Sequence, residues 1–432
     1  MIARLIAGAA LAACALAAPA AAQDFAIVNA TLAIGDGSEP VQGGTLVVRG
    51  GKVAAAGAGV AVPPGLRTID ASGKWVAPGF VIAAGSLGLW DVEAVGPSND
   101  TSAGAAPFHA GLDVSTSIDT STTPVAVSRA AGITRVGVAP DAGNAIFAGQ
   151  GAVIDLGADP QAVTVPRAFQ YVELGEHGSE LAGGSRVAAH AVLRNALREA
   201  RELATAPAAP RREDALLTRA DAQALGPVVQ GRQPLFVRVE RASDIRAVLA
   251  LRAEFPALRL VIVGADEGWL AARELAAAGV PVIANPLSDL PTQFESLAST
   301  QSNVGRMAAA GVKVAIGRLG DGIKPRNAPQ YAGNLVALNR LPGASGLAWG
   351  KALAAITSVP AEILGQGDRI GSLRPGRAAD VVIWDGDPLE VSSGVVSVYV
   401  DGVEQSLANH QTRLRDRYAN PQEGALPKAY DW

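Results

Sequence analysis

Hydrophobic positions along the chain form two kinds of pattern, short apolar runs and longer stretches with helical spacing. Runs of about five apolar residues bounded by Gly, Pro or polar residues are typical of buried strands, whereas apolar positions three and four apart indicate helices. The runs that predict strands are Ile133–Val138, Leu235–Val239, Leu258–Val263, Val280–Ala284 and Val312–Ile316. The stretches that predict helices are Pro124–Ala131, Ser185–Ala204, Ala242–Phe255, Glu267–Ala278 and Val304–Ala310. Alternating units of this kind favour a parallel α/β architecture, and we expect a (β/α)8 barrel.

The two ends of the chain carry a different pattern, in which short β-rich runs are separated by Gly and Asp turns. In the first 75 residues these runs are Ala26–Asn29, Thr45–Val48 and Lys52–Ala55, and near the other end they are Ala379–Trp384 and Val395–Val400. Such runs are typical of a β-meander. We therefore expect one small β-sandwich built from residues 23–77 and 366–408, a barrel at residues 78–365 and a polar tail at residues 409–432.

The first 22 residues have the pattern of an export signal. Arg4 precedes an Ala-rich apolar run, and Ala20 to Ala22 form a small-residue cleavage site. The run is too short to span a bilayer, which takes about 20 apolar residues. We expect a periplasmic or secreted protein with a signal peptide at residues 1–22. The alternative is a membrane-tethered lipoprotein, because Leu11-Ala12-Ala13 precedes Cys14, the one cysteine of the chain.

Composition and charge narrow the range of partners. The 432 residues are 49% hydrophobic and 4% aromatic, which suits an α/β protein with a large core. The formal net charge is −4, and no long basic block is present. This pattern argues against nucleic acid as a partner, and no transmembrane segment is predicted. A small-molecule substrate or ligand is the expected partner, and a homo-oligomer stays open.

Three motifs connect the chain with a known family. Pro78-Gly79 lies in the apolar stretch Trp75–Leu89, and Gly371-Ser372-Leu373-Arg374-Pro375-Gly376 is followed by Ala379-Asp380-Val381-Val382. Together they resemble the amidohydrolase superfamily, in particular its imidazolonepropionase-like branch. The resemblance implies a (β/α)8 barrel that hydrolyses carbon–nitrogen bonds with a divalent metal at its mouth. It also implies an Asp and a His-x-His pair after the Pro-Gly, a Lys, two later His residues and an Asp on the last strand.

The chain departs from that ligand set at each place. Ile82, Ala84 and Ser86 occupy the three positions after Pro-Gly. The remaining ligand positions fall on Asp155, on Arg238 and Glu240, near Val263 or Gly264, and closest to Leu319 with Asp321 two residues beyond. No two of the four histidines have His-x-His spacing. We therefore predict that the usual zinc ligands are replaced, although carboxylates alone could hold a Mg²⁺-like or Ca²⁺-like ion.

Charged residues remain at the predicted mouth of the barrel, where the reactive groups of such folds lie. The candidate catalytic residues are Asp155, Glu240, Asp266 and Asp321. The candidate substrate-binding residues are Arg238, Arg318 and His177. Two carboxylates in different environments could perform acid–base hydrolysis without a metal. In the alternative interpretation, the pairs Arg238–Glu240 and Arg318–Asp321 fill a vacated site.

Three hypotheses about function follow from these residues. The first is an exported amidohydrolase-type enzyme acting on carbon–nitrogen bonds. The second is a pseudoenzyme that binds a small molecule or a partner without catalysis. The third is a hydrolase that uses carboxylates with an altered metal or none. A fold by itself does not decide among them.

Overall fold

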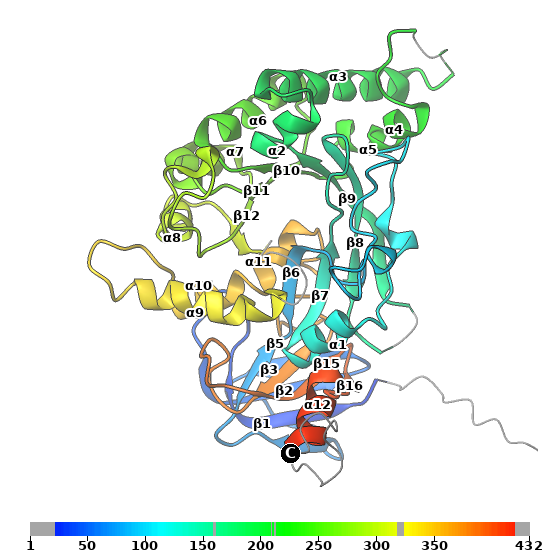
Figure 1. The fold of residues 1–432 in the computed structure, drawn as a ribbon. Helices are drawn as coiled ribbons and strands as arrows, with labels where there is room; N and C mark the ends of the chain where they lie inside the picture. The colour runs from blue at the N-terminus through cyan, green and yellow to red at the C-terminus, as the bar shows by residue number, and fades with distance from the viewer. Residues whose placement is uncertain (1–21, 159–160, 209, 211–212, 318–323, 420–432) are drawn as a thin grey trace, which may run out of the picture.

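The fold consists of an eight-stranded barrel stacked on a second eight-stranded sheet (Figure 1). The computed structural model describes residues 22–158, 161–208, 210, 213–317 and 324–419. The predicted signal peptide, apart from Ala22, lies outside these residues, as do Cys14, Arg318 and Asp321. None of the helices in the described ranges has the length and apolar character that a bilayer crossing requires.

The barrel strands follow one another in chain order around the sheet, as the alternating pattern predicted. They are β6 (Phe80–Gly85), β7 (Ile133–Val138), β8 (Phe147–Asp155), β9 (Val163–Glu173), β10 (Leu235–Val239), β11 (Leu260–Gly264), β12 (Val282–Ala284) and β13 (Val314–Ile316). The strands β6 and β13 are not paired directly. Instead, the Ile316 amide donates to the Ala355 carbonyl and the Val81 amide donates to the Ile356 carbonyl. Residues 355–356 therefore connect β13 with β6 where the barrel closes.

One strand breaks the regularity of a (β/α)8 barrel. Strand β8 pairs antiparallel with both β7 and β9, whereas the other neighbouring pairs are parallel. No helix separates β7, β8 and β9 in the described part of residues 139–162. A reversed strand needs no crossover helix, because an antiparallel neighbour is reached through a simple turn. The barrel is therefore present as predicted, but with a hairpin in place of two of its βα units.

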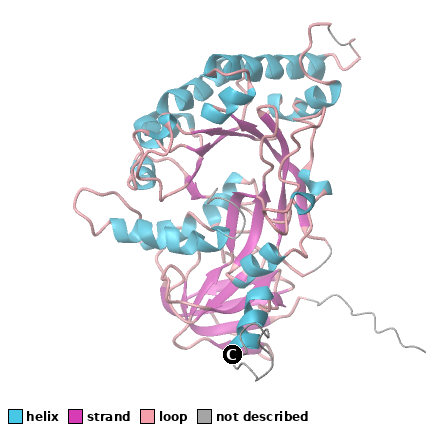
Figure 2. Ribbon diagram, in the orientation of Figure 1, coloured by secondary structure: helices cyan, strands magenta, loops and turns pink. Residues whose placement is uncertain are grey.

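Helices cover the outer side of the barrel wall (Figure 2). They are α1 (Thr123–Ala130), α2 (Gly175–Leu181), α3 (Arg186–Thr205), α4 (Arg219–Ala224), α5 (Gly226–Val229), α6 (Ala242–Glu254), α7 (Ala272–Ala278), α8 (Asn303–Ala309), α9 (Ala328–Leu338), α10 (Trp349–Ala354) and α11 (Ser358–Ile363). The long helix α3 buries Leu193 and Leu197 on one face, as its apolar spacing predicted. Short 3₁₀ helices include η3 (Gly268–Ala271), η4 (Phe294–Ser296) and η5 (Lys324–Asn327).

Alternate residues of the strands face the inside of the barrel, as strand geometry requires. Val81 and Ala83 lie in the same buried cluster as Phe169 and Tyr171 of β9, and the Phe169 ring stacks on Phe236 at 4.2 Å. The intervening side chains belong to the outer cluster beneath the helices. The barrel interior is thus a packed core up to the level of the strand ends.

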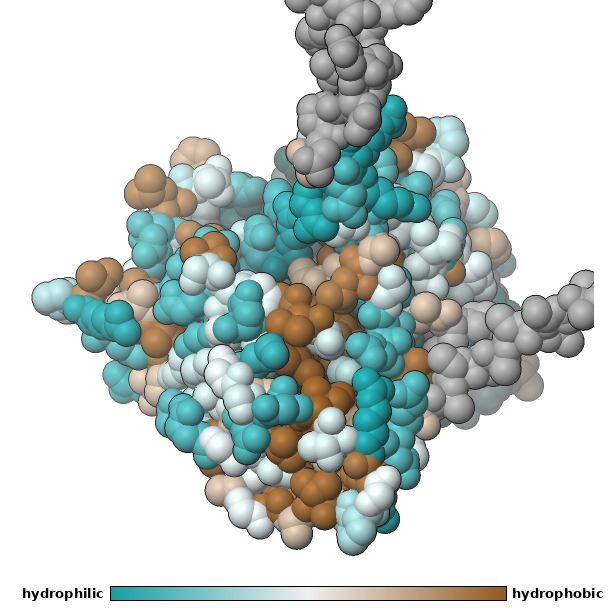
Figure 3. All heavy atoms as spheres, turned by 90° about the horizontal axis from the view of Figure 1, so that it is seen from below, coloured by the Kyte–Doolittle hydropathy of each residue, from teal (hydrophilic) through white to brown (hydrophobic). Residues whose placement is uncertain are grey.

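Both ends of the chain build the second sheet, so the expected small β-sandwich is confirmed in part. Its strands are β1 (Phe25–Leu32), β2 (Val41–Arg49), β3 (Lys52–Gly57), β4 (Arg67–Asp70), β5 (Trp75–Pro78), β14 (Val381–Trp384), β15 (Val395–Val400) and β16 (Val403–Gln405). Strand β5 pairs with β1 from the first segment and with β14 from the last. Seen from this end, apolar residues gather in a band across a mostly polar surface (Figure 3).

The chain passes directly from the second sheet into the barrel at Gly79. This residue separates β5 from β6, and its amide donates to the Asp380 carbonyl at 2.9 Å. A Cβ atom at Gly79 would lie 2.2 Å from the Thr134 side chain, so a larger residue does not fit there. The Pro-Gly motif therefore has a steric role where the two sheets meet. In the described part of the segment predicted as a polar tail, residues 409–419, the chain forms helix α12 (His410–Ala419).

Candidate functional site

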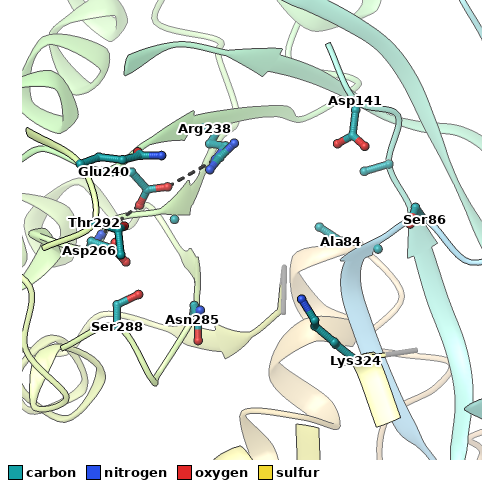
Figure 4. A pocket seen from close by; sticks show the side chains of 14 residues that line it. Ala84, Ser86, Asp141, Arg238, Glu240, Asp266, Asn285, Ser288, Thr292 and Lys324 are labelled. Carbon is teal, nitrogen blue, oxygen red and sulfur yellow. Dashed lines mark hydrogen bonds and ion pairs between the residues drawn. The ribbon is translucent and has the colours of Figure 1, made fainter. Parts of the chain in front are cut away.

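A cavity of about 390 Å³ opens at the carboxyl ends of the barrel strands (Figure 4). Strands β6, β10, β11 and β12 and the segments that follow them supply most of its wall. Its lining residues are Ala84, Gly85, Ser86, Ala139, Asp141, Arg238, Glu240, Gly264, Asp266, Asn285, Ser288, Thr292, Gln293 and Lys324. The volume lies in the usual range of small-molecule sites. Among the sequence candidates, Arg238, Glu240 and Asp266 come together here.

The end of β11 is bent so that Asp266 reaches the cavity. Gly264 has a φ of +96° and Ala265 a φ of +56°, and such a conformation is costly for a residue other than glycine. A Cβ atom at Gly264 would lie 2.3 Å from the Glu240 carboxylate. The bend brings the Asp266 amide to 3.1 Å from Glu240 Oε2, to which it donates. Glycine at position 264 is therefore required for the close approach of the two acids.

Arg238 lies between two buried carboxylates. Its Nη1 is 3.3 Å from Glu173 Oε1, and its Nε is 3.3 Å from Glu240 Oε1. The Arg238 side chain is 26% exposed, whereas Glu173 and Glu240 are buried. Burial alone would lower the pKa of Arg238, but the charges of Glu173 and Glu240 outweigh it and raise that pKa. Arg238 therefore stays charged and holds both acids.

The two acids of the cavity have raised pKa values. Burial, together with the nearby charge of Asp266, raises the pKa of Glu240 to about 7. Burial also raises the pKa of Asp266, against the lowering effects of a hydrogen bond from Ser288 and the charge of Arg238. Glu240 therefore exchanges a proton near neutral pH, which is a property of acid–base and ligand-binding sites.

The first barrel strand contributes no metal ligand of the implied kind. Ala84 and Ser86 line the cavity, and the Ser86 hydroxyl accepts a hydrogen bond from Trp90 Nε1 at 3.1 Å. Ile82 lies in the outer cluster beneath the helices, because its side chain points away from the barrel interior. Position 82 is therefore not part of the rim, which corrects its assignment to the ligand set.

Asp155 lies at the opposite end of the barrel from the cavity. It was expected at the mouth, but β8 runs antiparallel, so the carboxyl end of this strand reaches the base. There, Asp155 Oδ2 is 3.7 Å from Arg135 Nη1. Arg135 also contacts Asp380 at 2.7 Å and Asp401 at 2.8 Å, and its side chain is 5% exposed. We call Arg135, Asp155, Asp380 and Asp401 the base cluster.

His177 also lies outside the cavity lining. It stands on α2 with a side chain that is 48% exposed, 3.6 Å from Glu180. Arg318 and Asp321 belong to residues that the structure does not describe, so their predicted roles stay predictions.

Several cavity residues were not among the sequence candidates. Glu173, which pairs with Arg238, was not among the candidate site residues, because β9 was not predicted as a strand. Ser288, Thr292 and Gln293 come from the segment between β12 and α8. That segment carries no regular pattern that could have placed it over the barrel.

The segment between β12 and α8 is fastened to α2 and α3 by one carboxylate. Glu295 Oε2 accepts a hydrogen bond from the Glu176 amide at 2.7 Å and from Arg186 Nη2 at 3.2 Å. Arg186 is also paired with Asp244 at 3.0 Å. Gly175 has a φ of +70°, and a Cβ atom there would lie 2.4 Å from Glu295 Oε2. This contact fixes the part of the rim that bears Ser288, Thr292 and Gln293.

The donor set does not fit an imidazole-rich metal centre. Within the described ranges, no group of three or more His, Cys, Asp or Glu side chains is placed to hold a metal ion. Ala84 has no donor atom, and Glu173 and Glu240 are held by Arg238. A guanidinium between two carboxylates competes directly with a cation for the same oxygens.

Comparison with known proteins places these features in context. The model of the amidohydrolase family matches residues 186–404, slightly more than half of the chain. The amidohydrolase tasK of Hapsidospora irregularis is 47% identical over 60 residues, which is 14% of this chain and 6% of that protein. The chain thus spans only a small part of that curated relative.

Solved structures resemble the chain over most of its length. An amidohydrolase from Thermotoga maritima has a TM-score of 0.77 and 26% identity, and the match covers 88% of this chain and 99% of that one. Molinate hydrolase has a TM-score of 0.55 and 17% identity, with 94% and 98% covered. Phenylurea hydrolase B has a TM-score of 0.54 and 15% identity, with 94% and 100% covered. The last two likenesses concern the fold alone.

Proposed function

This chain belongs to the amidohydrolase family, and we propose that its barrel mouth binds a small polar molecule without metal-dependent hydrolysis. The observation that carries the proposal is the position of Arg238 between Glu173 and Glu240. A metal-bound hydroxide needs several donors that converge on one ion and leave one position open. Here the converging acids are paired with a guanidinium, and Ala84 offers no ligand atom.

The cavity supports binding in its own right. It combines about 390 Å³ of space with hydroxyl, amide and charged side chains that face inward. Such a mixture fixes the orientation of a polar ligand through a few placed contacts. The family and the barrel suggest ligands related to amides, ureas or small peptides, and we include these in the test.

We also propose that the protein is exported. The support is the signal-peptide pattern of residues 1–22, and the lipoprotein alternative through Cys14 stays open. N-terminal sequencing of protein from the periplasm would identify the mature start. A first residue other than Gln23, or a lipid on Cys14, would overturn the first version of this proposal.

The central test is metal analysis and ligand screening of the same purified protein. We expect less than stoichiometric zinc, and an upward shift of Tm with a subset of acyl-amino acids, dipeptides or cyclic amides. The shift should disappear in Arg238→Met but persist in Lys351→Gln, which alters an exposed lysine on α10. Stoichiometric zinc together with turnover that a chelator abolishes would refute the proposal.

A second function has a specific observation in its favour, the pair Glu240 and Asp266. Their carboxyl groups line one cavity, and the pKa of Glu240 lies near 7. An ionised Glu240 could take a proton from water as the water attacks a carbonyl carbon, and could then give that proton to the leaving nitrogen. Hydrolysis of a panel substrate that survives a chelator but is lost in Glu240→Gln would favour this function.

A further inference from the structure

Two opposite walls of the cavity carry charged side chains. Glu240 and Asp266 lie on one side beside Arg238, and Lys324 extends into the cavity from the other side, which also bears Asp141 (Figure 4). These residues come from distant parts of the chain: Glu240 follows β10, Asp266 follows β11, and Lys324 begins η5. The separation is therefore a property of the folded barrel rather than of one sequence motif.

The acidic wall has more negative charge than its described cation offsets. Arg238 is the cation in contact with Glu240, and it is shared with Glu173. The Asp266 amide donates to Glu240, which holds the backbone of Asp266 against that carboxylate but adds no full charge. Like charges at this distance repel each other, and a positively charged ligand group would relieve that repulsion.

The other wall offers a cation that is available to a ligand. Lys324 is exposed, and its ammonium group makes no ion pair or hydrogen bond with the described residues. It begins η5 and lines the cavity together with Ser86. An ammonium group on a flexible stem suits an anionic group of variable position.

Neutral hydrogen-bonding groups line the space near the acidic wall. Asn285, Ser288, Thr292 and Gln293 face the cavity from the end of β12 and the segment that follows it. Ser288 interacts with the Asp266 side chain. These groups can bind the uncharged middle of a ligand without preference for either sign of charge.

We propose that the ligand of this pocket is a small zwitterion, whose ammonium group lies against Glu240 and Asp266 and whose carboxylate lies against Lys324. This inference rests on the proposed binding function and specifies its ligand class. It requires both charged groups on one molecule, because the paired acids Glu240 and Asp266 suit the ammonium group and the ammonium of Lys324 suits the carboxylate.

The test is a calorimetric titration with ω-amino acids of increasing length, from glycine to 6-aminohexanoate. We expect one chain length to bind about threefold more tightly than the alkylamine and at least about tenfold more tightly than the alkyl carboxylate of the same length. The optimal length then measures the separation of the two walls. Equal affinity for the amine alone and the amino acid would remove Lys324 from the proposal.

Two variants separate the two ends of the ligand. Asp266→Asn should weaken binding of the amino acid and of the simple amine about tenfold or more. Lys324→Gln should weaken binding of the amino acid about threefold and leave the amine unchanged, because the lysine is exposed. Lys351→Gln, on α10, is the matched control and should change neither. Identical losses for both ligands in both variants would contradict the assignment of the ends.

Proton release gives a readout that a merely structural role would not change. An ammonium group favours the ionised carboxylates, so binding at pH 6.5 should release protons, measured as a buffer-dependent binding enthalpy. The release should shrink in Asp266→Asn. If cyclic amides bind while every ω-amino acid fails, the zwitterion is wrong and the binding function stands. If no compound binds and zinc is stoichiometric, the proposed function itself fails.

Discussion

In the described part of the barrel, an arginine lies among acids at each end, Arg135 at the base and Arg238 at the mouth, and the two clusters differ in burial and in the length of their ion pairs. At the base, Arg135 donates to both oxygens of Asp380 at 2.7 and 2.9 Å and is 5% exposed. At the mouth, Arg238 makes two contacts of 3.3 Å and is 26% exposed. Short bidentate pairs are the strong form of this interaction. The guanidinium at the base is therefore fully engaged by the acids around it, whereas the arginine at the mouth borders a cavity that can hold another molecule.

The contrast shows what distinguishes a structural cluster from a binding cluster in the same barrel. The base cluster also joins the two sheets, because Arg135 belongs to β7 while Asp380 and Asp401 flank strands of the second sheet. The mouth cluster joins strands of one sheet only and borders the cavity. Charge composition alone does not separate the two, but distance and burial do.

The largest effect is expected at the base. Asp380→Asn removes the charge that Arg135 meets most closely and leaves a buried guanidinium undercompensated, so we expect a loss of about 3 kcal/mol in the free energy of unfolding. Urea denaturation would measure it. Asp401→Asn is the matched variant, and it should cost about 1 kcal/mol or less because this side chain is 54% exposed. Equal losses for the two variants would show that burial does not make Asp380 a stronger partner of Arg135 than Asp401 is.

The next effect is a pH dependence that arises at the mouth. The pKa of Glu240 rises from 4.5 to about 7 on folding, so the folded state binds more protons between these values. Stability should then fall as pH rises through this window, by about 3 kcal/mol at most for this group. Thermal unfolding from pH 4.5 to 8 would record it. Glu240→Gln should flatten the curve, and an unchanged slope would assign the effect to other groups.

A smaller loss of stability is expected for Arg238→Met. The substitution leaves Glu173 and Glu240 without their shared cation, but partial exposure allows water to replace it, and we expect about 1–2 kcal/mol at pH 8. The cost should shrink at pH 5.5, where Glu240 is protonated. Chemical denaturation at the two pH values tests this. A loss as large as that of Asp380→Asn would remove the distinction between the ends of the barrel.

The smallest effect concerns the rim. Glu295→Gln keeps an acceptor for the Glu176 amide but loses the charge that meets Arg186, so we expect about 1 kcal/mol. Hydrogen exchange should accelerate in residues 285–302 and stay unchanged at the base cluster. Faster exchange throughout the barrel would mean that Glu295 stabilises the whole fold rather than this segment.

Sequence pattern predicted most of the barrel because its strands are apolar runs with clear ends. Leu235–Val239 and Ile133–Val138 are strands with the expected bounds, and the predicted helix at Ser185–Ala204 is α3 within one residue at each end. The hairpin of β8 and β9 was not predicted. The first half of β9 is partly exposed, and the direction of β8 depends on pairing with distant strands, which local spacing does not encode.

The candidate site was predicted in part for the same reason. Arg238 and Glu240 flank the end of a strand, so the parallel-barrel rule placed them at the mouth. Asp155 was misplaced because that rule fails for a reversed strand. The contact of Glu295 with Gly175 joins two segments that are far apart in the chain, and no motif in either segment predicts that they meet.

The route of the chain through the second sheet has a consequence for synthesis. Strand β5 is made early, yet its partner β14 leaves the ribosome only after the whole barrel. Until then β5 presents a bare apolar edge, which is a template for wrong pairing and a site that chaperones recognise. A nascent chain that stalls before Val381 would therefore aggregate rather than persist as a soluble barrel.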